Sequence, residues 1–333
     1  MKAFQILVIA ILLQSCTAQN SKIDGISFVA SRQEAEQKHV DAVLNLKANY
    51  AAVMPFGFIR NLGTPEIVFD TDRQWFGETS KGAKQYIRLL QKNNIKVMVK
   101  PQIWIWRGEF TGYLKMKDEA NWQKLENAYS EFILTYAKLA HEMNADILCI
   151  GTELEQFIVN RPDYWKQLIS EIKMEYQGKL TYAANWDEYK RVPFWGDLDF
   201  IGVDAYFPIS ENQTPTVEEA EAGWMKWKQE LKGISERWDK PILFTEYGYR
   251  SVDFAGKEPW ISDRDMNEVN LKAQTNLTQG LFNSLYEEDW YAGGFIWKWF
   301  IDHENSGGLE NPMFTPQNKP AEAVIRKRFN KAN

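Results

Sequence analysis

Eight short apolar runs recur along the chain, and they limit the fold more than any other feature of the sequence. Each run is nearly continuously apolar, which is typical of strands buried on both faces of a parallel sheet, whereas a strand with one solvated face alternates. The runs span 25–30, 50–56, 95–102, 145–153, 180–186, 199–207, 241–248 and 292–300. They predict a mainly parallel sheet that is covered on both sides.

Helix candidates separate most of these runs. In residues 119–143, apolar and aromatic side chains recur every three or four positions from Trp122 to Tyr136, which is the spacing of one buried helix face. The other candidates cover roughly 32–48, 78–93, 163–177, 217–238 and 264–288. Residues 187–198 are too few, and too broken by Pro and Gly, for a full helix. Eight strands with mostly helical crossovers predict a single-domain α/β fold, the (β/α)8 TIM barrel, because a doubly wound sheet usually has fewer strands.

The predicted strand ends carry polar and aromatic side chains. In a (β/α)8 barrel the catalytic groups lie at the C-terminal ends of the strands. Those ends carry Lys100, Gln102, Trp104, Glu153, Asn185, Trp186, Asp204, Tyr206, Glu246 and Trp297. Paired carboxylates suit glycoside hydrolysis, because one protonates the leaving oxygen while the other attacks, or activates water at, the anomeric carbon. Indole rings stack on sugar rings, and polar side chains bond the hydroxyls, so these strand ends predict carbohydrate chemistry.

Glu153 and Glu246 are the candidate catalytic pair, at the ends of the fourth and seventh strands. Glu246 follows the apolar run "PILF", where an unpaired carboxylate costs free energy. Either acid could instead be structural: Glu153 could favour the N-terminus of the next helix, although Glu155 fits that role better. Trp297 could be a sugar platform or part of the core, since one face of each barrel strand is core. A retaining mechanism requires the two carboxyl groups to lie about 5 to 5.5 Å apart.

Other chemistries have little support. The three histidines are widely spaced and form no H-E-x-x-H motif, and no G-x-S-x-G elbow, P-loop or G-x-G-x-x-G occurs. A net charge of -6 argues against nucleic acid as a partner. The loop "DHENSGG" (302–308) could coordinate a cation through Asp302 and Glu304, and the alternative that we favour is a solvated loop. We therefore expect no metal and no cofactor.

The first residues, "MKAFQILVIAILLQSC", predict export. A positive start and an apolar stretch too short to span a membrane precede a small residue and a cysteine. "LQSC" resembles a bacterial lipoprotein lipobox, in which cleavage precedes the cysteine and Cys16 is lipidated; the alternative is a plain secretory signal with a chance cysteine. The other cysteine, Cys149, lies in an apolar run and reads as a small buried side chain, so no disulfide framework is possible. We expect a signal peptide (1–15), a tether (16–24) and a catalytic domain (25–330).

Six segments of the chain resemble glycoside hydrolase family 113, whose members are β-1,4-mannan-active enzymes of clan A, a clan of retaining (β/α)8 hydrolases with glutamates ending strands four and seven. The segments span nearly the whole mature chain: "VKPQIW", "IGTELE", "DFIGVDAYFP", "FTEYGYRS", "GGFIWKWF" and "FTPQNKPA". The resemblance implies that Glu153 is the general acid/base and Glu246 the nucleophile, with Tyr206 holding the Glu246 carboxylate. It also implies that further residues line the subsite where the bond breaks: Lys100, Asn185, Trp186, Asp204 and Trp297.

The sequence departs from the family pattern at two positions. Most clan A enzymes have Asn immediately before the acid/base, where this chain has Thr152, and Gln102 stands where a histidine is expected in similar enzymes. Both departures bear on substrate specificity. We expect a monomeric, lipid-anchored β-1,4-mannanase on the periplasmic or cell-surface side of a bacterial membrane. The alternatives are a β-glucan-active or exo-acting clan A enzyme and a non-catalytic glycan-binding lipoprotein.

Overall fold

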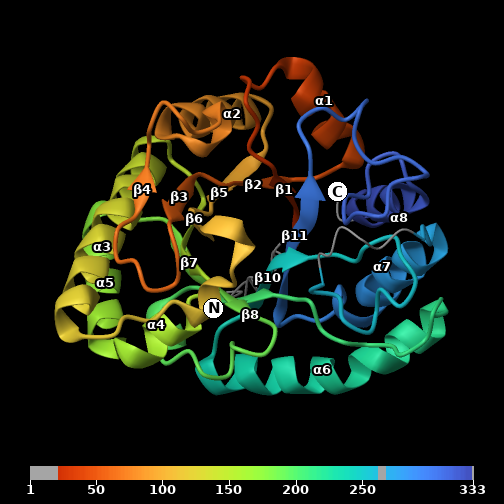
Figure 1. The fold of residues 1–333 in the computed structure, drawn as a ribbon. Coiled ribbons are helices and arrows are strands. Elements are labelled where there is room, and N and C mark those ends of the chain that lie inside the picture. Colours follow the sequence, from red (N-terminus) through yellow and green to blue (C-terminus); the bar gives the residue numbers. More distant parts are fainter. Residues whose placement is uncertain (1–21, 262–267, 332–333) are drawn as a thin grey trace, which may run out of the picture.

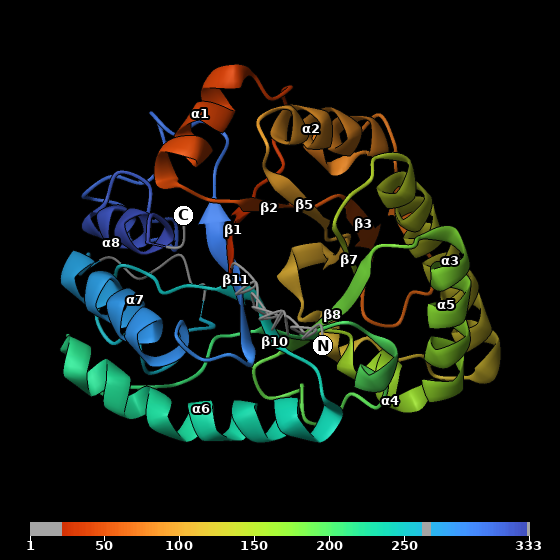
Figure 2. The ribbon, with the colours of Figure 1, turned by 180° about the vertical axis from the view of Figure 1, so that it is seen from behind.

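The computed structural model describes residues 22–261 and 268–331, and within them eight parallel strands close into a barrel. Helices ring the barrel on its outside (Figure 1), and the view from behind shows the same ring (Figure 2). The barrel strands are β1 (Ile23–Phe28), β2 (Tyr50–Val53), β5 (Lys96–Val99), β7 (Ile147–Thr152), β8 (Lys179–Asn185), β9 (Ile201–Asp204), β10 (Ile242–Tyr247) and β11 (Tyr291–Trp299). The predicted (β/α)8 barrel is confirmed. The predicted signal peptide and Cys16 lie outside the described residues.

The helices follow the predicted segments closely. They are α1 (Gln37–Leu46), α2 (Ser80–Lys92), α3 (Glu119–Glu142), α4 (Glu155–Asn160), α5 (Pro162–Glu175), α6 (Val217–Trp238), α7 (Leu271–Leu285) and α8 (Pro320–Phe329). α4 and α8 were not predicted, and α7 begins later than the predicted 264 because Asn270 caps it by accepting the Ala273 N–H at 2.9 Å. The connection 187–198 contains only a short 3-10 turn, as expected. Among the described residues no helix is long and apolar enough to cross a membrane.

Two predicted strands end earlier than expected, each at a proline. The run 95–102 ends as a barrel strand at Val99, before Pro101, and the run 50–56 ends at Val53, before Pro55. Proline has no N–H to donate, so it does not continue the ladder of a central strand. Beyond the prolines the chain forms a separate small sheet of β3 (Phe56–Ile59), β4 (Val68–Phe69) and β6 (Gln102–Ile105). Gln102 therefore lies on β6, past the C-terminal ends of the barrel strands, and its assignment to the third barrel strand was wrong. Trp104, which was expected after that strand, lies on β6 as well.

Apolar side chains fill the N-terminal half of the barrel interior. They form a cluster of Ile23, Ala52, Met98, Ile147, Cys149, Ala183, Phe200, Leu243 and Phe295. A second and larger core lies between the strands and the surrounding helices and includes the fully buried Trp165, Trp195 and Trp224. The predicted burial of Cys149 is confirmed. Because the lower barrel is packed, polar chemistry is confined to the C-terminal ends of the strands.

The two glycines of α6 should respond in opposite ways to alanine. A Cβ on Gly223 would lie 1.8 Å from the Ile209 carbonyl oxygen, so Gly223→Ala should lower the free energy of unfolding by about 1–3 kcal/mol through overpacking. A Cβ on the exposed Gly233 would meet nothing within 4 Å, so Gly233→Ala should raise it by about 0.5–1 kcal/mol through helix propensity. Urea denaturation of both variants checks this pair, and a shift of the same sign in both would contradict the helix packing described here.

Candidate active site

The inward-facing side chains change from apolar to polar near the C-terminal end of each barrel strand. Side chains two residues apart in a strand point to the same face. On β5 the inward Met98 is followed two positions later by Lys100, and on β8 the inward Ala183 is followed by Asn185. The period of two therefore carries the polar side chains into the mouth of the barrel, directly above the apolar cluster.

β10 brings two successive polar side chains into the barrel. Its inward Leu243 predicts that Thr245 also points inward and that Glu246 points outward. However, the pairing with β9 passes from Phe244 opposite Val203 to Glu246 opposite Asp204, so two residues of β10 oppose one of β9. Such a β-bulge re-aims side chains and is common beside active sites. The irregularity places Thr245 beside Asp204 and Glu246 beside Lys100 in the mouth of the barrel.

Glu246 is nearly fully buried and is surrounded by hydrogen-bond donors. Its Oε1 accepts from Lys100 Nζ at 2.5 Å and from Gln102 Nε2 at 3.0 Å, and its Oε2 accepts from the Tyr206 hydroxyl at 2.8 Å. All three partners donate, and an ionised carboxylate accepts only, so the set matches the charged form of this group. Three separate elements thus fix the Glu246 carboxylate in one orientation.

Lys100 is a fully buried cation shared between two carboxylates. Its Nζ lies 2.5 Å from Glu246 Oε1 and 3.2 Å from Asp204 Oδ1, and Asp204 Oδ1 also accepts from Thr245 at 2.7 Å. Burial alone would lower the pKa of Lys100, but the charges of Asp204 and Glu246 raise it above its ordinary value, so the ammonium stays charged. Burial, and then the charge of Glu246, raise the pKa of Asp204. Lys100 and Asp204 therefore support the Glu246 carboxylate from inside the barrel.

Glu153 has a different environment. It follows β7 directly, has a left-handed φ of 51°, is partly exposed, and its carboxyl group forms no hydrogen bond with any described residue. Burial raises the pKa of Glu153 well above its ordinary value, and the negative charges of Asp204, Glu246 and Glu188 raise it further. The effect of Glu246 on this pKa means that the two predicted glutamates lie within electrostatic reach of each other. Glu246 is held by hydrogen-bond donors, whereas Glu153 favours its protonated form.

The predicted aromatic residues differ in how far they are exposed. Trp104 is 48% exposed on β6, and it lies two residues after Gln102, so both side chains are on the face of β6 that meets Glu246. Trp186 is partly buried and stacks on Trp260, with ring centroids 5.0 Å apart. Trp297 is half-buried, and the Lys298 Nζ lies 5.3 Å from its ring centroid. Indole surface is therefore available on several sides of the barrel mouth.

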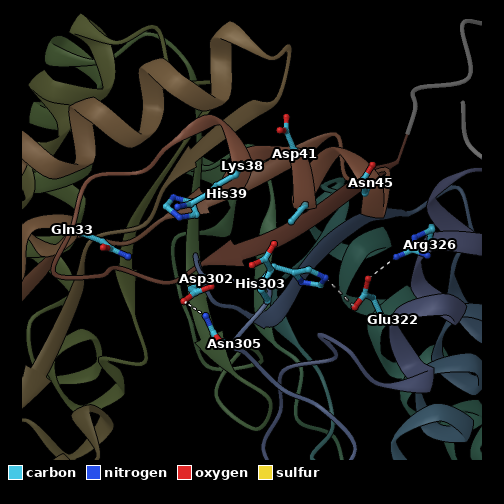
Figure 3. Close-up of a pocket in the computed structure, with 12 residues that line it drawn as sticks. Gln33, Lys38, His39, Asp41, Asn45, Asp302, His303, Asn305, Glu322 and Arg326 are labelled. Carbon is cyan, nitrogen blue, oxygen red and sulfur yellow. Dashed lines mark hydrogen bonds and ion pairs between the residues drawn. The ribbon is translucent and has the colours of Figure 1, made fainter.

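A separate polar pocket of about 380 Å³ lies between α1, the loop after β11 and α8. Figure 3 shows the His303 ring of that loop pointing toward Glu322 of α8, which is also bonded to Arg326. Glu304 also lines the pocket, and Asp302 accepts from Asn305 at 2.9 Å. Within the described part of the chain no group of three or more His, Cys, Asp or Glu side chains could hold a metal ion. None of the predicted catalytic or sugar-binding residues lines this pocket.

Sequence reasoning missed several residues of the barrel mouth. Thr245, which bonds Asp204, was visible in "FTEYG" but was not distinguished from the apolar strand around it. Trp260 comes close to Trp186 only through the fold. Tyr182 and Glu188, which bond one another at 2.7 Å beside Glu153, had no signal in the sequence beyond their residue types.

Comparison with known proteins agrees with this geometry. The family model of Glycoside Hydrolase Family 113 matches residues 29–319. The chain belongs to glycoside hydrolase family 113. The predicted family is thus confirmed, and the protein is a glycoside hydrolase. No curated protein sequence matches this family 113 chain.

The family 113 chain shares its fold with solved glycosidases. The structure of a GH113 β-mannanase from Alicyclobacillus acidocaldarius in complex with ManMIm has a TM-score of 0.82 at 22% identity, over 94% of this chain and 98% of that one. A complex structure of a GH113 β-1,4-mannanase has a TM-score of 0.80 at 22% identity, over 93% and 99% of the two chains. A β-glucuronidase from Faecalibacterium prausnitzii has a TM-score of 0.57 at 14% identity, over 88% of this chain and 45% of that one. These likenesses concern the fold.

Lys100→Met should destabilise the protein in a pH-dependent way. Removing the cation leaves Asp204 and Glu246 buried without compensation, which should lower the free energy of unfolding by about 3–5 kcal/mol at pH 8. Lys100 lowers the pKa of Asp204, so its loss raises that pKa further above the unfolded value. A carboxyl group whose pKa is raised in the folded state contributes stability at low pH that is lost as the pH rises. The loss of unfolding free energy in Lys100→Met should therefore be smaller at pH 5 than at pH 8.

Urea denaturation at the two pH values measures this effect. Lys84→Met is the matched control, because it removes a partly exposed ion pair with Glu142 and should change the free energy of unfolding by less than about 1 kcal/mol. An equal loss of stability at both pH values for Lys100→Met would rule out the charge balance described here.

Proposed function

We propose that this family 113 enzyme is a retaining β-mannanase that cleaves β-1,4-mannosidic bonds in mannan or mannooligosaccharides. The observation that carries the proposal is the unequal environment of the two glutamates. Glu246 is fixed by three donors, and Glu153 is unbonded with a raised pKa. A nucleophile must be ionised and oriented, whereas a general acid must hold a proton near neutral pH.

In the first step the Glu246 carboxylate attacks the anomeric carbon while the bond from that carbon to the leaving sugar oxygen breaks. Glu153 gives its proton to this oxygen, and a glycosyl ester forms on Glu246. In the second step Glu153, now a carboxylate, takes a proton from water as the water oxygen attacks the anomeric carbon. The Glu246 ester bond breaks, the sugar keeps its anomeric configuration, and Glu153 is protonated again. No cofactor takes part in this sequence.

Three features support a β-linked glycan as the substrate. Gln102 of β6 bonds Glu246, and Trp104 follows two residues later on the same face of that strand. The rise along the strand from Gln102 to Trp104 is about 7 Å. That spacing is on the scale of one sugar ring. Asn185 ends β8, and its amide nitrogen has no partner among the described residues, which leaves it for a sugar hydroxyl. The fold relatives named above are described as a β-mannanase and a β-1,4-mannanase.

Glu246→Gln should abolish hydrolysis of the preferred substrate, with a loss of about 10⁴-fold or more in kcat, because no nucleophile remains. The protein without residues 1–15 is incubated with mannan, mannooligosaccharides, cellooligosaccharides and xylan, and the released sugars are measured. The proposal is supported if the wild type cleaves mannan and mannooligosaccharides but neither cellooligosaccharides nor xylan. Equal activity of the variant and the wild type would refute the nucleophile assignment, and binding without cleavage of any glycan would identify a glycan-binding protein.

We also propose that Cys16 carries a lipid anchor that holds the enzyme at a bacterial membrane. The lipobox-like "LQSC" at 13–16 supports this proposal. Cys16→Ala should move the protein from the membrane fraction to the soluble fraction after cell lysis, because a protein without the attached acyl chains loses its membrane affinity. Cys149→Ala, at the buried cysteine, is the control and should remain in the membrane fraction. Retention of Cys16→Ala with the membranes would exclude the anchor.

A further inference from the structure

The backbone amide that follows Glu153 is held by a side chain. Leu154 N–H donates to the Tyr182 hydroxyl oxygen at 2.5 Å, while Glu153 N–H donates to the Ala183 carbonyl at 2.8 Å. Glu153 itself has a left-handed φ of 51°, which L-residues rarely adopt unless their surroundings impose it. Two neighbouring residues of β8 therefore hold the two amides that flank the Glu153 side chain.

Tyr182 is in turn bonded to a buried acid, Glu188. The tyrosine has one hydroxyl proton, and because its oxygen accepts from Leu154, that proton is given to Glu188 Oε1 at 2.7 Å. Glu188 Oε2 accepts the Asn185 N–H at 2.9 Å, and the turn is closed by Glu188 N–H donating to the Asn185 carbonyl at 2.9 Å. Burial raises the pKa of Glu188, and the bonds from the Asn185 N–H and the Tyr182 hydroxyl oppose that rise because they favour the ionised carboxylate. A buried acid is unfavourable unless it is bonded, and here both of its oxygens are used.

Packing fixes the position of the Tyr182 ring. The ring is fully buried and contacts Trp165, Phe194 and Trp195, with centroid distances of 5.9, 5.8 and 6.2 Å. A Cβ on Gly151 of β7 would lie 3.0 Å from Tyr182 Cε2, so the strand that carries Glu153 approaches the ring closely because it has glycine there. A side chain enclosed in this way holds its hydroxyl at one place, and the Leu154 amide with it.

We propose that Tyr182 and Glu188 are positioning residues for the acid/base Glu153. Tyr182 holds the left-handed turn that aims the Glu153 carboxyl into the barrel mouth. Glu188 accepts the Tyr182 hydroxyl proton on one oxygen and the Asn185 backbone N–H on the other. One buried carboxylate therefore fixes both the Tyr182 hydroxyl and the backbone at the end of β8. Neither residue touches the reacting atoms. The inference rests on the proposed function of Glu153, and it concerns geometry that can also be measured without a substrate.

Tyr182→Phe tests the proposal because it keeps the ring and removes the hydroxyl. With aryl β-mannooligosaccharides, kcat/KM should fall about 30-fold or more for a weakly acidic phenol, which needs a proton to leave, since small misplacements of a catalytic group have effects of this size. It should fall less than about threefold for 2,4-dinitrophenol, which leaves without a proton. A similar loss for every leaving group would overturn the proposal.

Tyr176→Phe is the matched control. Tyr176 is also buried and donates to the Ala145 carbonyl at 2.7 Å, but it lies at the opposite end of β7. The control loses one buried hydrogen bond, whereas Tyr182→Phe loses the bonds to both Leu154 and Glu188, so Tyr182→Phe should have the lower thermal stability of the two. Only Tyr182→Phe should depend on the leaving group, and the same dependence in Tyr176→Phe would overturn the proposal.

Hydrogen exchange of the Leu154 amide provides a measurement that needs no catalysis. Exchange at Leu154 should be at least about tenfold faster in Tyr182→Phe than in the wild type or Tyr176→Phe, because its acceptor is gone. Unchanged protection at Leu154 would overturn the positioning role whatever the activity. If the wild type cleaves no β-linked glycoside, the proposed function fails, and this exchange measurement still decides whether Tyr182 holds the turn.

Glu188→Gln tests the second link of the chain. In the wild type the Tyr182 hydroxyl and the Asn185 N–H bond different oxygens of Glu188, and in Gln an NH2 group replaces one of these oxygens, so one of the two donors loses its acceptor. Exchange at Leu154 or Asn185 should therefore increase, and the leaving-group dependence should shift in the same direction as in Tyr182→Phe, by about threefold to tenfold. Wild-type exchange at both amides together with wild-type kinetics would remove Glu188 from the proposal.

Discussion

The barrel mouth depends on one buried cation. The Lys100 ammonium is shared between Asp204 of β9 and Glu246 of β10, so a single side chain from the end of β5 ties together both carboxylates and the strands that carry them. The hydroxyls of Tyr206 and Thr245 and the amide of Gln102 supply the remaining donors to these two carboxyl groups. Removal of any one of these donors would leave a buried carboxyl group with too few hydrogen bonds, which is why so many polar side chains converge on Asp204 and Glu246.

The sequence predicts the barrel and the polar strand ends because both follow from simple periods. Runs of apolar residues separated by helices specify parallel strands, and a period of two places Lys100 and Asn185 above the inward residues of their strands. The same reasoning failed at Pro55 and Pro101. A proline can lie in an edge strand or a turn, so the runs could not show that the chain leaves the barrel there and forms the small sheet that carries Gln102 and Trp104.

Two other features were beyond a linear pattern. A strict alternation along β10 turns Glu246 away from the barrel, and only the bulge against β9 brings it beside Thr245 in the mouth. Likewise, Tyr182 and Glu188 are ordinary members of the segment "TYAANWDEY", and their role arises from the turn Asn185–Glu188 that folds the acid back onto its own strand. Bulges and local turns depend on tertiary packing, so the residues that aim the glutamates were less visible than the glutamates themselves.

In the mechanism that we propose, the same electrostatics lets Glu153 exchange roles between the two steps. In the free enzyme, the negative charge of Glu246 adds to burial in raising the pKa of Glu153, which keeps a proton available for the leaving sugar. When Glu246 forms the glycosyl ester, that charge is gone, and one of the causes of the raised pKa disappears with it. The pKa of Glu153 then falls, which favours the carboxylate that must accept a proton from water. A nucleophile that loses its charge on reacting thereby converts its neighbour from acid to base, provided that the turn at Glu153 keeps the two groups within electrostatic reach.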